Sequence, residues 1–233
     1  MMKSEVADRV ADVVHGVVER AFAPVHEVRN ALARSVAEEG LPVPRSALAP
    51  LRDLVATRLG EKGAIQLGLG VVVAPEAVED AELFLEWWQH DGGDKPRRLE
   101  FDLNRSSMGF YDYLSAEWFV NVRRTGQPGI AGPYVDVHGT DRYVFTMSAP
   151  IEAEGRFVGV AGGDLAVTKL EQLVLSELAG DVAEFVVLSD EDRVVLSTSG
   201  KWLVGSLMKR VPPKAQVRRL PDVPWRVAVR TQA

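Results

Sequence analysis

Residues 111–164 constrain the fold more than any other part of the 233-residue chain. An amphipathic segment with aromatic side chains at helical spacing comes first, and a loop rich in glycine and proline follows it. Three strand-like runs come next, at residues 134–137, 142–150 and 156–161, with short turns between them. Short runs separated by polar turns are typical of antiparallel strands. We therefore predict a helical segment that packs beside an antiparallel sheet.

Two acidic residues accompany these strands. The last run leads through two glycines into Asp164, so we expect this carboxylate where a strand ends and a helix begins. Asp is a preferred helix N-cap, and capping is compatible with ligand contact if each oxygen serves one partner. Asp136 lies two residues after Tyr134, on the same face of the predicted strand, where it would add a second carboxylate. Its alternative is an exposed position at the strand end.

This order of features resembles the ligand-binding module of double Cache sensor domains, which contain a PAS-like sheet. In that family a helix carries a tryptophan followed by an aromatic residue, a loop brings a Pro-Tyr step, and the closing strand reads Gly-Val-x-Gly-x-Asp. The residues at those positions here are Trp118-Phe119, Pro133-Tyr134 and 159–164. The resemblance covers residues 3–205 in the order of elements, but only residues 111–167 in residue detail.

The resemblance implies a ligand site without catalysis. The predicted ligand-binding residues are Tyr111, Trp118, Phe119, Tyr134, Asp136 and Asp164. Aromatic faces attract cations, and nearby acids add negative charge, so this set favours an ammonium group. Packing in the core is the alternative for aromatic residues at helical spacing, and for Phe119 it is the expected one.

One departure from the family pattern concerns the ligand's carboxylate. Amino-acid-binding members have an arginine two residues before the tryptophan, and Ala116 stands at that position here. We therefore expect an amine or amino-acid-like ligand that is held mainly through its cationic group. Arg123 and Arg124 lie about one helical turn beyond Trp118. If they turned toward the site, a small organic acid would become a candidate ligand.

Composition and motifs exclude several other classes of protein. The net charge of −6 argues against a nucleic-acid surface, which is usually basic. The absence of cysteine excludes disulfides, thiolate metal sites and cysteine nucleophiles. The four histidines lack metal-binding spacing, and there is no phosphate loop or nucleophile elbow. We expect no cofactor, no metal and no enzymatic activity; an enzyme that uses Asp164 and Tyr134 is a weaker rival, because no base lies beside a nucleophile.

The remaining elements give the predicted fold class, a mixed α/β (α+β) chain. Residues 4–38 predict a long N-terminal helix, with Pro24 as a candidate kink. We divide the chain into an N-terminal helical segment (1–62), a PAS-like Cache module (63–166), and a connecting helix with a reduced β module (167–233). Residues 82–90 read as one strand of a hairpin, in which successive tryptophans face opposite sides of the sheet.

Valines on the N-terminal helix cover a wider arc than one buried face requires, so we predict a homodimer through this helix. Packing of the valines on the chain's own sheet is the alternative. A pure interaction protein with a vestigial ligand site is a second rival to the sensor hypothesis.

The predicted location follows from hydropathy. No run of about 18 apolar residues is present, and the N-terminus carries several charges, so neither a membrane span nor a signal peptide is indicated. We expect a cytoplasmic protein that contacts no membrane and no nucleic acid directly. It would pass its signal to a separate protein, such as a transcriptional regulator. An excised receptor ectodomain is the alternative, because most double Cache relatives lie outside the cytoplasm.

Overall fold

The computed structural model describes residues 3–90, 92–93, 95–138, 141–179 and 184–230. These residues form two antiparallel sheets and a long N-terminal helix, which confirms the predicted fold class. The chain folds into two compact units. The larger unit comprises residues 21–131 and 135–165, and the smaller one comprises the described parts of 1–20, 132–134 and 166–233.

A six-stranded sheet has the order β3-β2-β1-β6-β5-β4. Its strands are β1 (Gly68–Val73), β2 (Phe84–Gln89), β3 (Arg97–Arg98), β4 (Gly129–Val135), β5 (Tyr143–Ala153) and β6 (Arg156–Ala166). The central strand β1 pairs antiparallel with β2 on one side and with β6 on the other. In this register Gly70 lies opposite Trp87 in β2 and opposite Gly162 in β6.

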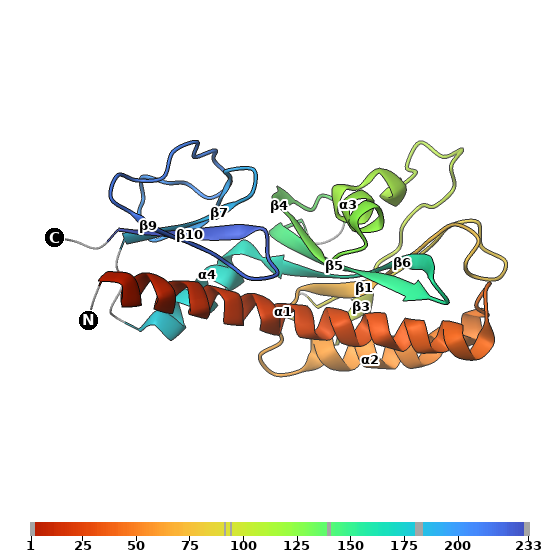
Figure 1. Ribbon diagram of the computed structural model, residues 1–233. Coiled ribbons are helices and arrows are strands. Elements are labelled where there is room, and N and C mark those ends of the chain that lie inside the picture. Colours follow the sequence, from red (N-terminus) through yellow and green to blue (C-terminus); the bar gives the residue numbers. More distant parts are fainter. Residues whose placement is uncertain (1–2, 91, 94, 139–140, 180–183, 231–233) are drawn as a thin grey trace. The chain divides into compact units, whose positions relative to one another are not determined.

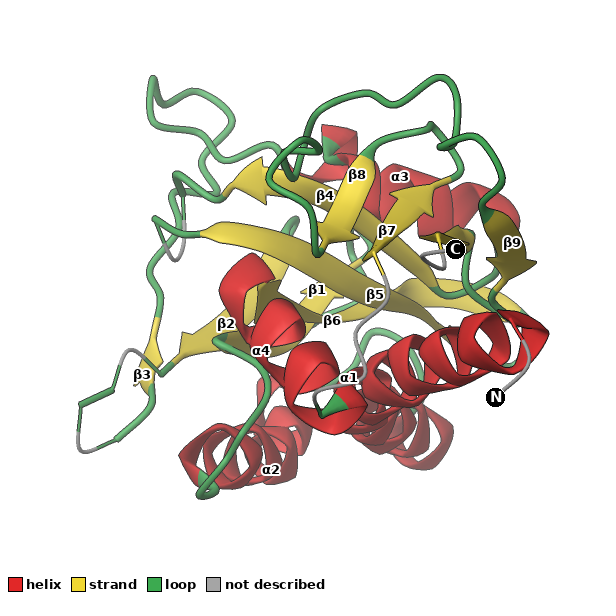
Figure 2. Cartoon of the chain, turned by 90° about the vertical axis from the view of Figure 1, so that its left-hand side faces the viewer, coloured by secondary structure: helices red, strands yellow, loops and turns green. Residues whose placement is uncertain are grey.

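Helices cover the two faces of this sheet differently. On one face lie α2 (Ala49–Gly60), the short 3-10 helix η1 (Arg45–Leu48) and the later part of α1 (Lys3–Glu39), while α3 (Glu117–Thr125) lies on the other (Figures 1 and 2). Arg52 of α2 forms a two-bond ion pair, 2.8 and 3.1 Å, with the buried carboxylate of Glu86 in β2. Because neighbouring strand residues face opposite sides, Trp87 points toward the α3 face.

The N-terminal helix α1 is a single helix that includes Pro24. The valines that were predicted to widen the apolar arc of this helix are buried within the chain itself: Val14, Val18 and Val25 are at most 1% exposed. A surplus apolar arc therefore gives no reason for a homodimer, because one chain already covers these side chains. The homodimer stays a prediction without that support.

The smaller unit contains α4 (Val167–Leu178) and a four-stranded sheet with the order β8-β7-β10-β9. Its strands are β7 (Glu184–Ser189), β8 (Val194–Ser197), β9 (Gln216–Arg219) and β10 (Trp225–Arg230). Apolar side chains from three strands, among them Val186, Val194 and Ala228, form its core. This sheet corresponds to the reduced β module expected at this end of the chain.

Candidate functional site

Asp164 lies inside β6 and not at a junction between strand and helix. It pairs with Gly68 of β1, and the strand continues to Ala166. Helix α4 begins only at Val167, and its N-cap residue Ala166 makes no side-chain capping bond. The prediction that Asp164 caps this helix is therefore wrong, because pairing with β1 extends β6 beyond the two glycines.

The Asp164 side chain is 3% exposed and is held by two hydrogen bonds. The indole Nε1 of Trp87 donates to Oδ2 at 3.0 Å, and the hydroxyl of Thr146 in β5 donates to Oδ1 at 2.7 Å. Burial raises the pKa of Asp164 to about 7, the negative charge of Asp136 acts in the same direction, and the two hydrogen bonds oppose the rise. A neighbouring cation would favour the ionised form of this carboxyl group.

Glycines in β1 and β6 make room for the Trp87 side chain. A Cβ atom on Gly68 would lie 2.6 Å from the Trp87 Nε1, and one on Gly162 would lie 2.7 Å from its Cη2. Real side chains do not approach this closely, so the indole requires glycine at both positions. Trp87 and Trp88 face opposite sides as predicted, but the direct role of Trp87 as a partner of Asp164 was not predicted.

The aromatic residues of the predicted site differ in burial. Phe119 is fully buried, with its ring centroid 5.7 Å from Tyr113 and 5.8 Å from Phe157, and it packs as a core residue. Trp118 is half-buried, and its ring lies 6.4 Å from the Trp87 ring. Of the two, Trp118 therefore has surface to offer to a ligand.

Tyr111, Asp136 and Asp164 share one neighbourhood. Burial raises the pKa of the Tyr111 hydroxyl, and the charges of Asp136 and then Asp164 raise it further. Asp136 follows β4 directly and is half-buried, and its backbone N–H donates to the carbonyl of Arg142 at 2.9 Å. Two carboxylates and a phenol from separate parts of the chain thus lie within electrostatic range of one another. The half-buried Tyr134, in contrast, belongs to the smaller unit.

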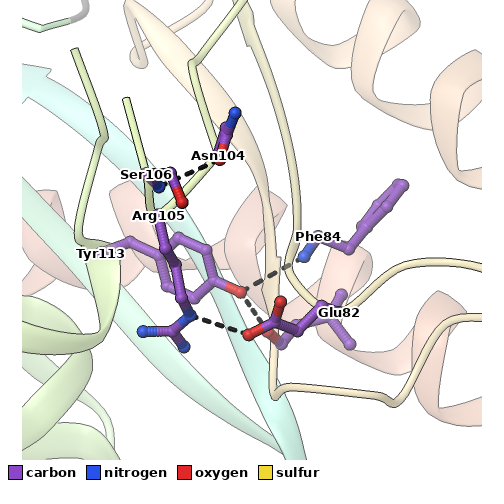
Figure 3. Close-up of polar contacts among 7 residues, drawn as sticks. Glu82, Phe84, Asn104, Arg105, Ser106 and Tyr113 are labelled. Atoms are coloured by element: carbon purple, nitrogen blue, oxygen red, sulfur yellow. Dashed lines mark hydrogen bonds and ion pairs between the residues drawn. The ribbon is translucent and has the colours of Figure 1, made fainter. Parts of the chain in front are cut away.

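Tyr113 fastens the segment that carries Tyr111 and Trp118 to the sheet. Tyr113 lies in the 3-10 helix η2 (Tyr113–Ser115), directly before α3. Its hydroxyl donates to the Val73 carbonyl at 3.0 Å and accepts from the Phe84 N–H at 3.3 Å. Figure 3 shows this hydroxyl near an exposed ion pair between Arg105 and Glu82, whose nitrogen and oxygen atoms are 2.8 Å apart. The Tyr113 hydroxyl therefore ties this segment to both β1 and β2.

The two arginines considered for an acidic ligand, Arg123 and Arg124, are exposed in the last turn of α3. Ala116 is the N-cap residue of the same helix, at its opposite end. This placement gives no support to an arginine clamp for a carboxylate.

A separate hollow of about 360 Å³ lies in the larger unit. It is lined by Arg29, Asn30, Ala33, Gly126, Gln127, Pro128, Pro150 and Glu152. None of the six predicted ligand residues lines it, and the side chains of Asn30, Gln127 and Glu152 are exposed. The buried carboxylate of Asp164 gives more specific chemistry, so we take the Asp164 neighbourhood as the candidate site. No group of three or more metal-binding side chains occurs among the described residues.

The comparison with known families identifies the class of this chain, a sensory ligand-binding domain. The family model described as methyl-accepting chemotaxis protein-like, first PDC sensor domain, matches residues 53–172. This match spans more than half of the chain, so the chain belongs to that family of chemoreceptor-type sensor domains, which are not enzymes.

Among known proteins, the chain is similar to the methyl-accepting chemotaxis protein TlpQ of Pseudomonas aeruginosa, with 26% identity over 170 residues. The matched region covers 64% of this chain and 24% of TlpQ, so the chain corresponds to a minor part of that relative.

Two solved structures share the fold. The structure named methyl-accepting chemotaxis protein X has a TM-score of 0.63 and 17% identity, and the match covers 97% of both chains. The ligand-binding domain of the Pseudomonas fluorescens chemoreceptor CtaA, in complex with L-valine, has a TM-score of 0.62 and 16% identity, with 98% of this chain and 94% of that chain covered.

The prediction of a cytoplasmic location is wrong. PDC sensor domains of methyl-accepting chemotaxis proteins are periplasmic or extracellular, and the family match places this chain among them. The absence of apolar segments does not indicate the compartment, because a sensory domain needs no membrane-spanning segment within its own fold. Within the described residues, no helix has both the length and the apolar character required to cross a bilayer.

Proposed function

We propose that this domain senses a small amine or amino-acid-like molecule whose ammonium group binds at Asp164. The observation that carries the proposal is the buried carboxylate itself, which accepts hydrogen bonds from Trp87 and Thr146. Asp136 lies close enough to raise the pKa of Asp164. The negative charge of Asp136 disfavours ionisation of Asp164, and a cation between the two side chains would relieve that repulsion.

The surroundings of Asp164 also suit a cation. The half-buried Trp118 offers an aromatic face, and a cation over such a face gains about 0.5–2 kcal/mol. Tyr111 adds a hydroxyl that is close to both acids. The related structure of CtaA contains L-valine, an amino acid with the same ammonium group. We therefore place the cationic group of the ligand at Asp164 and the rest of the ligand on the α3 side of the sheet.

The sensing module would be residues 63–166, supported by the helices of residues 1–62 and followed by residues 167–233. Ligand binding would order the segment between η2 and β4 and so shift the population of conformations. The signal would pass to a separate protein or to further segments of a receptor, since the matched region covers 24% of TlpQ.

The first experiment compares L-valine with isobutylamine, which is the same molecule without the carboxylate. Because Ala116 replaces the family's carboxylate-binding arginine, isobutylamine should bind at least as tightly as L-valine in calorimetric titrations. A thermal-shift screen of further amines, amino acids and carboxylic acids extends the comparison, since a ligand at 100 times its Kd stabilises by ~2.7 kcal/mol.

The matched variants are Ala116→Arg and Ser115→Arg. Ala116→Arg should shift the preference toward L-valine, whereas Ser115→Arg, at an exposed neighbouring position, should leave it unchanged. L-Valine that binds the unmodified protein a hundredfold more tightly than isobutylamine, or about 2.7 kcal/mol, would mean that another cation holds the carboxylate. A screen in which no amine or amino acid binds would contradict the proposed function.

A further inference from the structure

Ser148 of β5 is fully buried, yet its hydroxyl oxygen has no hydrogen-bond partner among the residues that the structure describes. Buried hydroxyl groups are nearly always hydrogen-bonded, because an unpaired one has lost its bonds to water without replacement. An exception in a native fold calls for a partner such as water or a ligand.

Ser148 faces the same side of the sheet as Asp164. Side chains two residues apart in a strand share a face, and the hydroxyl of Thr146, two residues earlier, binds Asp164. In the neighbouring strand β6, Gly162 has no side chain, and a Cβ there would lie 3.4 Å from the carbonyl oxygen of Met147, beside Ser148. Helix α3, which carries Trp118, packs over β5 on this face.

Other buried polar side chains of this sheet have clear partners. Glu86 pairs with Arg52, and Gln89 accepts a hydrogen bond from Arg97 at 3.2 Å. The residues on either side of Ser148 in β5, Met147 and Ala149, are buried and apolar. A polar residue without a partner at this position is therefore not explained by the folded chain alone.

We propose that the Ser148 hydroxyl is a second polar contact for the ligand bound at Asp164, and that the domain selects ammonium compounds with a further hydrogen-bonding group. This inference rests on the proposed function. Two residues along a strand span about 7 Å, so the second group would lie about that far from the ammonium, roughly the length of a four-carbon chain. A serine hydroxyl both donates and accepts, so a hydroxyl, an amide or a neutral ring nitrogen would suit it.

The test compares 4-aminobutan-1-ol with n-pentylamine, which has a methyl group in place of the hydroxyl. In calorimetric titrations, the unmodified protein should bind the amino alcohol about tenfold more tightly, the typical effect of one hydrogen bond. Ser148→Ala should bind the two compounds within about twofold of each other. Ser176→Ala, at an exposed position in α4, should keep the full preference.

Equal binding of both amines by the unmodified protein, or a preference that persists in Ser148→Ala, would overturn the assignment of Ser148 and leave the proposed function intact. Failure of both amines to bind would contradict the proposed function as well. The ligand-free Ser148→Ala variant should unfold at the same temperature as the unmodified protein or higher, because no hydrogen bond is lost. A Tm lower by more than roughly 4 °C, about 1 kcal/mol for a chain of this size, would show that the hydroxyl has a structural partner and would overturn the inference.

Discussion

Replacing Asp164 with asparagine should weaken the binding of a cationic amine by about tenfold or more, because a charge-assisted hydrogen bond contributes roughly 1.5–3 kcal/mol. Asparagine has nearly the same shape as aspartate. Its carbonyl oxygen would still accept from the Trp87 indole, and its amide would donate to the Thr146 hydroxyl, so both present contacts keep a partner. The loss of affinity therefore measures the attraction between the charge of Asp164 and the cationic group of the ligand.

The same variant should stabilise the ligand-free protein at pH 8. The folded-state pKa of Asp164 is about 7, raised from 3.8 chiefly by burial, so the folded protein retains a proton that the unfolded chain releases. Stability therefore falls as pH rises from about 4 to about 7, and the penalty is complete above that window. Removing the ionisable group should raise the free energy of unfolding at pH 8 by about 1–3 kcal/mol, and this gain should disappear toward pH 4.

Asp112→Asn provides the matched control, because Asp112 is exposed and has no place in the site. It should change neither the affinity for amines nor the pH dependence of unfolding. Unchanged amine affinity in a folded Asp164→Asn variant would remove Asp164 from the ligand site.

Gly70→Ala should strongly destabilise the larger unit. A Cβ at Gly70 would lie 2.2 Å from the carbonyl oxygen of Glu86 and 2.8 Å from the Cα of Trp87. Both atoms belong to the backbone of β2, which cannot move aside without breaking its pairing with β1. We expect a loss of about 3 kcal/mol or more, which lowers the Tm by roughly 6–12 °C for a chain of this size.

Gly60→Ala, at the end of α2, is the comparison for Gly70→Ala. The nearest atom to a Cβ at that position is Cδ of Pro96, at 4.0 Å, so the added methyl group has room. Alanine is also the better helix former, so this variant should equal or slightly exceed the unmodified protein in stability. A Gly70→Ala variant that melts within about 2 °C of the unmodified protein would show that β1 and β2 are not packed this closely.

Local patterns in the sequence were sufficient to predict most elements. Helix α4 begins at Val167, where the connecting helix was predicted to begin, and β5 and β6 contain the two runs predicted at 142–150 and 156–161, apart from Arg142. The strand β9, in contrast, was not predicted. It is short and has two arginines among its four residues, so it carries little hydrophobic signal.

The candidate site depends on contacts that local patterns cannot reveal. Trp87 and Asp164 are 77 positions apart and meet only because β1 lies between their strands. Asp164 and the glycines before it were predicted to lie where a strand ends and a helix begins, although Gly162 is within β6 and makes room for the Trp87 indole. Two glycines close together in a strand, Gly68 and Gly70, indicate that another part of the chain comes close to the backbone there. They do not indicate that this part is the side chain of Trp87. The burial of Ser148 likewise follows from tertiary packing.

The most direct test of an ammonium group at Asp164 is the number of protons released when an amine binds at pH 7. Titration calorimetry with isobutylamine, in buffers of different ionisation enthalpy, gives this number. Asp164, with a pKa of about 7, is roughly half protonated in the free protein, and a bound cation lowers that pKa. The account predicts release of up to about half a proton by the unmodified protein and none by Asp164→Asn. Binding without proton release in the unmodified protein, or equal release in both proteins, would contradict it.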